Sequence, residues 1–242
     1  MMDLHTIYDA SSDRLIELAA KNTFIAISAA WSTNSQANIV LTGGRTGAKI
    51  AAALSNEISD AIENFPEQVK GKKIHIWFSD ERFVAGDNSE RTDLAIMPEL
   101  VNAASVLEIH QIANSSKSTL EQAASSYSAE LTKILAGKKF DSVILSLGED
   151  GHVASCFPGQ DEIFNSSTAA IAVSNSPKPP AQRVSISLPA LGQAAQIFLF
   201  GLGEGKLQAV KAAQENDAQA VVTKLRQNSQ AGKMFLLTDR KD

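Results

Sequence analysis

An acidic side chain and an imidazole, Asp150 and His152, have the spacing and the setting for acid–base chemistry. The apolar run before them, Ser-Val-Ile-Leu-Ser-Leu at 142–147, predicts a buried strand of a parallel sheet. The glycines around them predict a bend at the carboxyl end of that strand, where open α/β sheets bind their ligands. Because the unperturbed pKa of histidine lies near neutral pH, His152 is a candidate general base. The alternative interpretation is structural, with Asp150 capping a helix and His152 filling space.

A second candidate site is the glycine-rich turn that follows the apolar run at 38–42 and contains Gly43, Gly44, Arg45 and Thr46. Glycine lets a ligand approach the backbone closely, and the unpaired N–H groups of the helix that follows suit a phosphate. Arg45 adds a guanidinium group and Thr46 a hydroxyl group, and both can donate hydrogen bonds to a phosphate. The turn matches neither the Walker pattern nor G-x-G-x-x-G, so nucleotide binding is not indicated. A plain turn between a strand and a helix is the alternative.

The charged triplet Asp80-Glu81-Arg82 follows the apolar run at 74–78, with only Ser79 between them. Charges at the end of a buried strand suit a binding cleft, and we expect Arg82 to bind a phosphate or a carboxylate. Asp80 is a further candidate site residue. For Asp80 and Glu81, a solvated loop with internal ion pairs is an equally good interpretation.

Two more cations stand beside predicted strands. Arg183 begins the run at 184–188, and Lys206 follows the glycine-rich end of the run at 197–201 and opens a helix. We expect both side chains to converge on the phosphate held by the turn at 43–47. Taken alone, each would be a surface charge more often than a ligand.

The remaining histidines and the cysteine do not indicate further chemistry. His5, His75 and His110 lack both the HExxH spacing and cysteine partners, so no metal site is predicted. Cys156 is the single cysteine and cannot form an internal disulfide, which fits a reducing compartment. We interpret it as a small buried hydrophobic residue rather than a nucleophile.

These residues need a scaffold that brings several strand ends together. Short apolar runs predict strands, and longer stretches with an apolar stripe predict helices. The strands are expected at 38–42, 74–78, 142–147, 169–173, 184–188, 197–201 and 234–238, and the helices at 12–31, 48–63 and 120–135. Strands that alternate with helices predict an α/β fold with a doubly wound, mainly parallel sheet flanked by helices. No repeat or low-complexity linker interrupts the sequence, so we expect one domain over residues 1–242.

The composition narrows the functional classes. Hydrophobic residues make up 44% and charged residues 20% of the chain, as in ordinary soluble globular proteins. A formal net charge of −5 argues against a general affinity for nucleic acid. The apolar runs are far shorter than the ~18 residues of a membrane span, and the first residues lack a signal-peptide pattern. We expect a cytoplasmic protein with no nucleic-acid or membrane partner. The oligomeric state cannot be deduced from one sequence.

Three segments, taken in this order, resemble the glucosamine-6-phosphate isomerase/6-phosphogluconolactonase family. They are Asp-Glu-Arg-Phe-Val at 80–84, Asp-Gly-His-Val-Ala-Ser at 150–155 with Phe-Pro-Gly at 157–159, and Ser-Pro-Lys-Pro-Pro at 176–180 with Arg183. The resemblance runs from the turn at 43 to Lys206 and implies a Rossmann-like fold. It also implies hydrolysis of a phosphorylated sugar lactone, 6-phosphoglucono-δ-lactone, to 6-phosphogluconate in the oxidative pentose phosphate pathway, without a cofactor.

The resemblance also implies a role for each candidate side chain. His152 would remove a proton from the attacking water, and Asp150 would orient the imidazole or the lactone. Arg82, Arg183 and Lys206 would anchor the 6-phosphate of the substrate. The glycine turn departs from the family's usual Gly-Gly-Ser-Thr-Pro, since an arginine stands in place of the serine and a glycine in place of the proline. This departure changes how the turn would hold a phosphate.

Two alternative functions remain open. A glucosamine-6-phosphate deaminase would share the glycine turn and the Asp-Gly-His bend. That family continues into a Phe-Asn-Glu-Pro-like stretch that supplies another carboxylate, whereas residues 153–158 contain no acidic residue. A non-catalytic sugar-phosphate sensor would carry a separate basic DNA-binding module, and the residues before the predicted strand at 38–42 are not basic.

Overall fold

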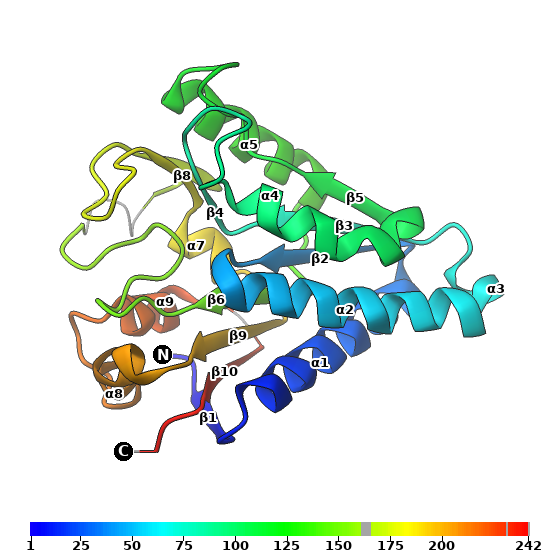
Figure 1. Cartoon of the computed structure of the whole chain (residues 1–242), viewed down its shortest axis with the longest axis horizontal. Helices are drawn as coiled ribbons and strands as arrows, with labels where there is room; N and C mark the ends of the chain where they lie inside the picture. The colour runs from blue at the N-terminus through cyan, green and yellow to red at the C-terminus, as the bar shows by residue number, and fades with distance from the viewer. Residues whose placement is uncertain (161–165, 231, 242) are drawn as a thin grey trace.

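The centre of the protein is a seven-stranded sheet in which every neighbouring pair of strands is parallel (Figure 1). The structure is a computed structural model and describes residues 1–160, 166–230 and 232–241. In spatial order, the strands are β1 (Leu4–Tyr8), β10 (Lys233–Thr238), β9 (Gln196–Gly201), β6 (Ser142–Ser146), β2 (Gln36–Leu41), β3 (Lys73–Phe78) and β5 (Leu107–His110). The mainly parallel α/β sheet predicted from the sequence is confirmed.

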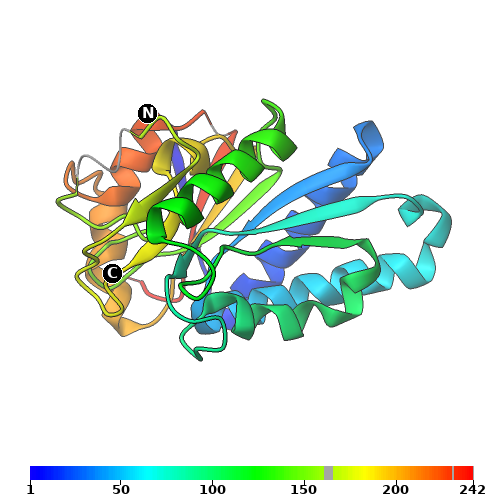
Figure 2. The same ribbon diagram turned by 90° about the horizontal axis from the view of Figure 1, so that it is seen from above.

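Helices cover both faces of this sheet. Helices α1 (Ser12–Thr33) and α2 (Gly44–Asn64) pack against each other on one side, and α5 (Leu120–Leu135) lies on the other, as Figure 2 shows. The shorter helices are α3 (Pro66–Val69), α4 (Thr92–Ile96), η1 (Met97–Val106), α7 (Leu188–Leu191), η2 (Glu204–Lys206), α8 (Leu207–Gln214) and α9 (Val221–Asn228). Among the described helices, none combines the length and the apolar character that crossing a bilayer requires.

A second, three-stranded sheet is antiparallel and consists of β4 (Asp80–Arg82), β8 (Arg183–Ile186) and β7 (Ala170–Val173). Two runs predicted as strands, at 169–173 and 184–188, therefore lie outside the parallel sheet. The segment 174–182 between them is too short for the crossover that parallel neighbours need, so the two strands pair as a hairpin. This small sheet places Asp80 and Arg82 next to Arg183, which pairs in register with Arg82.

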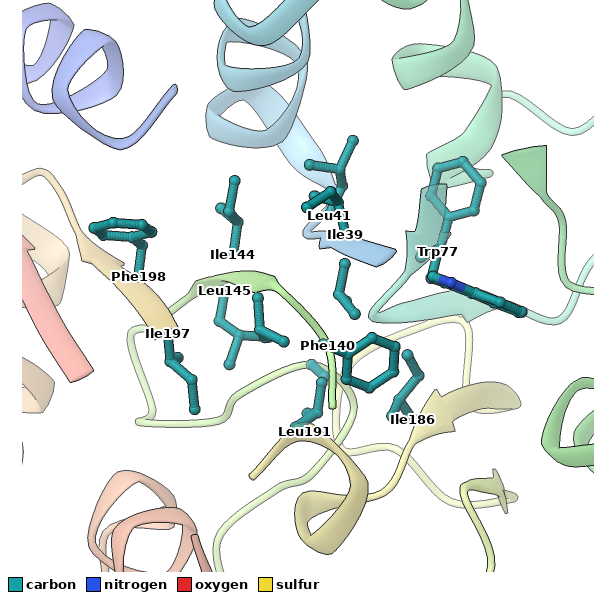
Figure 3. Packing of buried hydrophobic residues seen from close by; sticks show 14 of the residues in the cluster. Ile39, Leu41, Trp77, Phe140, Ile144, Leu145, Ile186, Leu191, Ile197 and Phe198 are labelled. Carbon is teal, nitrogen blue, oxygen red and sulfur yellow. The ribbon is translucent and has the colours of Figure 1, made fainter. Parts of the chain in front are cut away.

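The core follows the alternation of side chains along the parallel strands. Ile39, Leu41 and Ile144 point toward the side of α1 and α2, whereas Leu145 and Ile197 point toward the side of α7 (Figure 3). All five side chains are almost completely removed from solvent. Both faces of these strands are thus apolar, as expected for a parallel sheet covered by helices on both sides.

The order of the strands reverses beside β2. The chain runs from β2 outward through β3 to β5 and then returns to β6, on the opposite side of β2. At such a reversal the loops after the two central strands separate and leave a crevice at the carboxyl ends. The glycine turn after β2 and the Asp-Gly-His bend after β6 both lie at this crevice.

Candidate active site

A cavity of about 200 Å³ occupies the crevice at the carboxyl ends of β2 and β6. Its walls come from both central strand ends, from the small sheet and from the loop before α8. The lining residues are Thr42, Gly43, Gly44, Asp80, Arg82, Thr92, Ser146, Leu147, Gly148, His152, Ala154, Arg183 and Lys206. Four segments far apart in the sequence, each singled out for its chemistry, therefore meet at one place.

The imidazole of His152 is held by a carboxylate. Nδ1 of His152 lies 2.5 Å from Oδ1 of Asp150, and Nζ of Lys178 lies 3.1 Å from the same oxygen. The ring of Phe157 packs against the imidazole, with 4.7 Å between the ring centroids. Because Nδ1 donates to the carboxylate, Nε2 carries the lone pair and is left to react.

The surroundings of this pair keep the histidine neutral and the aspartate ionised. Burial lowers the pKa of His152 below its ordinary 6.5, against an opposing effect of the Asp150 carboxylate. Burial alone would raise the pKa of Asp150, but the hydrogen bonds and charges of His152 and Lys178 outweigh it and lower that pKa to about 2. At neutral pH, the bend thus presents an uncharged imidazole next to a carboxylate, the protonation states that a general base and its orienting partner need.

The glycines of the bend make room for the pair. A Cβ atom on residue 148 would lie 2.0 Å from Nδ1 of His152 and 2.6 Å from Oδ1 of Asp150, so only a glycine fits there. Gly151 has a φ of +82°, which glycine adopts without a steric penalty. The amide of Gly148 donates to the carbonyl of His152 at 2.7 Å, and the amide of Gly151 donates to the carbonyl of Gly148 at 3.0 Å. The bend is therefore closed by its own backbone.

Another part of the cavity wall is the amino end of helix α2. Gly44 begins this helix with a φ of +72°, and Gly43 precedes it. The first N–H groups of a helix have no partner within the helix and lie at its positive end, which favours an anion. A Cβ on residue 47 would come within 2.0 Å of the carbonyl oxygen of Thr42, so a glycine there lets the strand turn directly into the helix.

Three cationic side chains line the same cavity. Arg82 donates to the carbonyl of Glu90 and to the hydroxyl of Thr92, each at 3.2 Å, while its Nε is buried without a partner among the described residues. Arg183 is 5% exposed and its guanidinium donates to three backbone carbonyls at 178–180. Lys206 donates to the carbonyl of Leu147, and burial lowers the pKa of its ammonium group. The cavity therefore brings three cationic side chains together with His152.

The two carboxylates of the triplet have different surroundings. Asp80 lines the cavity, where its Oδ2 accepts from the hydroxyl of Ser155 at 2.6 Å. Glu81 is 1% exposed and accepts hydrogen bonds from the backbone amides of Arg82, Thr92 and Asp93 at 2.8–3.0 Å. It thus fastens the loop that carries Thr92 to the strand that carries Arg82, which is a structural role.

Cys156 lies just beyond the bend and is fully buried. Burial raises the pKa of its thiol to about 12, so it is not a thiolate at neutral pH. The interpretation of Cys156 as a buried hydrophobic residue is confirmed.

Both the sequence and the fold of this chain match known proteins. A sequence model described as glucosamine-6-phosphate isomerases/6-phosphogluconolactonase matches residues 10–233. The chain belongs to this family. A 6-phosphogluconolactonase of Mycobacterium tuberculosis is 33% identical over 211 residues, which are 84% of this chain and 82% of that protein. The human 6-phosphogluconolactonase is 30% identical over 171 residues, 69% of this chain and 66% of that protein.

Solved structures of family members have the same fold. The crystal structure of a 6-phosphogluconolactonase from Shewanella baltica superimposes with a TM-score of 0.79 at 23% identity and covers 98% of this chain and 97% of its own. The 6-phosphogluconolactonase of Trypanosoma brucei gives a TM-score of 0.76 at 22% identity, covering 98% and 97% of the two chains. The Rossmann-like architecture expected from the family resemblance is confirmed.

Most of the residues expected at the site line the cavity together, and three of them do not. Arg45 and Thr46 stand in the first turn of α2 but are not among the described residues that line the cavity, and Arg45 is exposed. Asp150 contacts the cavity through His152 rather than directly. This turn lacks the serine and the proline that are typical of the family. Of residues 43–47, Gly43 and Gly44 are the ones that line the cavity.

Several residues at the site were not predicted. Ser146 and Leu147 line the cavity and could have been found from their position at a strand end, whereas Thr92 gives no signal in the sequence. Lys178 lies in the proline-rich segment at 176–180, and its contact with Asp150 depends on the fold of that loop.

Proposed function

We propose that this protein hydrolyses 6-phosphoglucono-δ-lactone to 6-phosphogluconate, as the names of its relatives suggest for them. The observation that carries the proposal is the His152–Asp150 pair, whose imidazole lines a cavity of about 200 Å³ together with three cationic side chains. A phosphorylated sugar lactone offers the two groups that these walls suit, an electrophilic carbonyl and a phosphate dianion. The reaction is an acyl transfer to water in the oxidative pentose phosphate pathway.

In the first step, Nε2 of His152 removes a proton from water as the water oxygen bonds to C1 of the lactone. Asp150 holds the imidazole through Nδ1 and stabilises the imidazolium that forms. In the second step, the bond between C1 and the ring oxygen O5 breaks, and the imidazolium returns its proton to O5. A general base placed in this way contributes roughly 10²–10⁴-fold to the rate.

The tetrahedral intermediate needs donors for its oxyanion. The amides of Gly148 and Gly151 already donate within the bend, so they do not supply this stabilisation. We assign it to the unpaired amides at the start of α2, at Gly44, which lie in the same cavity as His152. Asp80, held by Ser155, completes the polar wall that positions the sugar.

The 6-phosphate is bound by Arg82, Arg183 and Lys206. Arg82 lines the cavity, where the carbonyl of Glu90 and the hydroxyl of Thr92 hold its guanidinium group. Arg183 is fixed by backbone carbonyls, so little conformational entropy is lost when it binds. This anchoring fixes the carbonyl carbon beside the base. Arg45 and Thr46, outside the lining, contribute through the charge and shape of the turn.

We propose that residues 1–242 form one domain. The reaction needs no cofactor, since neither redox chemistry nor a difficult leaving group is involved. A deaminase of the same fold is disfavoured because no carboxylate lies among residues 153–158. A sensor that binds a sugar phosphate without hydrolysing it would not require the hydrogen bond to Asp150 that prepares His152 as a base.

The test is the initial rate of hydrolysis of freshly generated 6-phosphoglucono-δ-lactone, with the spontaneous rate subtracted, for the wild type and for His152→Ala. We expect kcat to fall at least 100-fold in the variant while the KM changes little, because the base acts on the transition state. His5→Ala, which removes an exposed histidine, is the matched control. Turnover that survives in His152→Ala would require another base, and binding without turnover in the wild type would favour the sensor.

A further inference from the structure

A second cluster of chemically active side chains lies away from the cavity, between β3, β5 and α5. It consists of His75, Glu108, His110 and Glu130. In the register of the two strands, His75 is opposite Glu108, and Trp77 is opposite His110. None of these four residues is among those that line the cavity.

Three donor atoms of this cluster converge. Nδ1 of His75 lies 2.9 Å from Nε2 of His110 and 3.5 Å from Oε2 of Glu108, and all three atoms lie within 4.8 Å of one another. In a tetrahedral zinc site with bonds of about 2.0–2.2 Å, neighbouring donor atoms are about 3.3 Å apart. A bound zinc ion would replace the hydrogen bond between the two rings, with His75 in the tautomer that carries its proton on Nε2, and the three donors, already within 4.8 Å of one another, would adjust to this spacing.

A second observation supports a metal rather than an accidental contact. Nδ1 of His110 lies 2.7 Å from Oε1 of Glu130, so Nδ1 donates its proton to that carboxylate and the lone pair of Nε2 points toward His75. A carboxylate on the far nitrogen of a ligating histidine is the arrangement that orients imidazole ligands in zinc sites. The indole of Trp77 stacks on the His110 ring at a centroid distance of 3.8 Å and fixes its plane.

Burial and access also suit a bound ion. The side chains of His75 and His110 are almost completely buried, whereas those of Glu108 and Glu130 are 46% and 43% exposed. An ion can thus enter from solvent at the edge strand β5 and be held by buried imidazoles. Lys73 lies 3.7 Å from Oε1 of Glu108 and leaves Oε2 to face the histidines.

We infer that His75, His110 and Glu108 form a binding site for a zinc-like divalent cation that ties the edge strand β5 to β3, with Glu130 positioning His110. Two imidazoles and one carboxylate are a donor set that zinc prefers, and solvent fills the fourth position. This site is independent of lactone hydrolysis. The histidines carried no metal signal in the sequence because they stand on different strands, and only the sheet register brings them together.

The test uses the full chain after treatment with a chelator. Co²⁺ is titrated by its visible absorption and by quenching of the tryptophan fluorescence, and the Zn²⁺ affinity is measured by competition with a chromophoric chelator. We expect one saturable site, with binding at least tenfold weaker in Glu108→Gln and 10- to 100-fold weaker in Glu130→Gln. Both substitutions change half-exposed side chains and preserve their shape.

Two controls make the outcome decisive. Glu121→Gln removes an exposed carboxylate from the same helix α5 outside the cluster, and His152→Ala removes the imidazole of the cavity. Both should bind Co²⁺ and Zn²⁺ as the wild type does. The absence of saturable binding at one equivalent, or equal affinity in the wild type and Glu108→Gln, would overturn the proposal. Loss of binding in His152→Ala alone would place the ion in the cavity instead.

Discussion

Gly148→Ala is the substitution that tests most directly how the bend prepares His152. The added methyl group would lie 2.0 Å from Nδ1 of the imidazole, while an ordinary contact is 3.4 Å or more. The ring must therefore retreat by roughly 1.4 Å, or the short hydrogen bond to Asp150 must break. The backbone of the bend does not need to unfold, because its glycine at 151 remains.

The size of the effect follows from this displacement. A misplacement of about 1 Å at a reacting group costs about 100-fold in rate, and complete loss of a general base costs roughly 10²–10⁴-fold. We expect kcat for lactone hydrolysis to fall about 100-fold in Gly148→Ala, and the KM to change less than threefold because the phosphate-binding wall is untouched.

The control is Gly151→Ala in the same bend. A Cβ at this position meets nothing within 4 Å, although its φ of +82° makes the substitution cost about 1–2 kcal/mol of stability. Comparison of the two variants separates the steric effect on the imidazole from general strain in the bend. Rates are measured on fresh lactone, and folding is checked by urea unfolding. A kcat for Gly148→Ala within twofold of the wild type would refute the reasoning.

Three further predictions concern the protonation, the anchoring and the support of the site. Since burial lowers the pKa of His152 and only the neutral ring is a base, kcat/KM should fall with decreasing pH through an apparent pKa below 6.5; an acid limb above 7 would contradict this. Lys206→Ala should weaken the binding of 6-phosphogluconate at least tenfold by calorimetry but leave that of unphosphorylated gluconate unchanged; equal affinity would remove Lys206 from the site. Glu81→Ala deprives three backbone amides of their acceptor and should lower the free energy of urea unfolding by about 3 kcal/mol, whereas exposed Glu63→Ala should change it by less than 0.5 kcal/mol.

The parts of the fold that the sequence predicted are those in which the local pattern and the packing agree. The buried strands β2, β3, β6, β9 and β10 read as apolar runs because both of their faces are covered, and α5 occupies the predicted residues 120–135. Strands β1 and β5 were missed. Both are edge strands that include exposed residues, so they lack a continuous apolar run.

The site residues divide in the same way, into those whose place follows from the local sequence and those whose place depends on the fold. His152, Gly43 and Gly44 stand directly at strand ends, and their places follow from the topology of a parallel sheet. Arg45 also follows a strand, but the first turn of α2 carries its side chain out toward solvent, which the sequence does not reveal. Lys178 reaches Asp150 from a loop between two antiparallel strands, a contact that no local pattern encodes.

The pairing of β1 with β10 has a consequence for how the protein is made. Residues 4–8 form their parallel ladder with residues 234–238, so a strand that leaves the ribosome early has a partner that leaves it late. Until then, β1 has no strand of the sheet beside it. Closing so long a loop costs only about 0.6 kcal/mol more than closing one half its length. The distance along the chain therefore delays the pairing of β1 with β10 but costs the folded protein little stability. The last edge of the sheet therefore forms after synthesis has passed β10, and a stalled chain exposes the edge of β9 in its place.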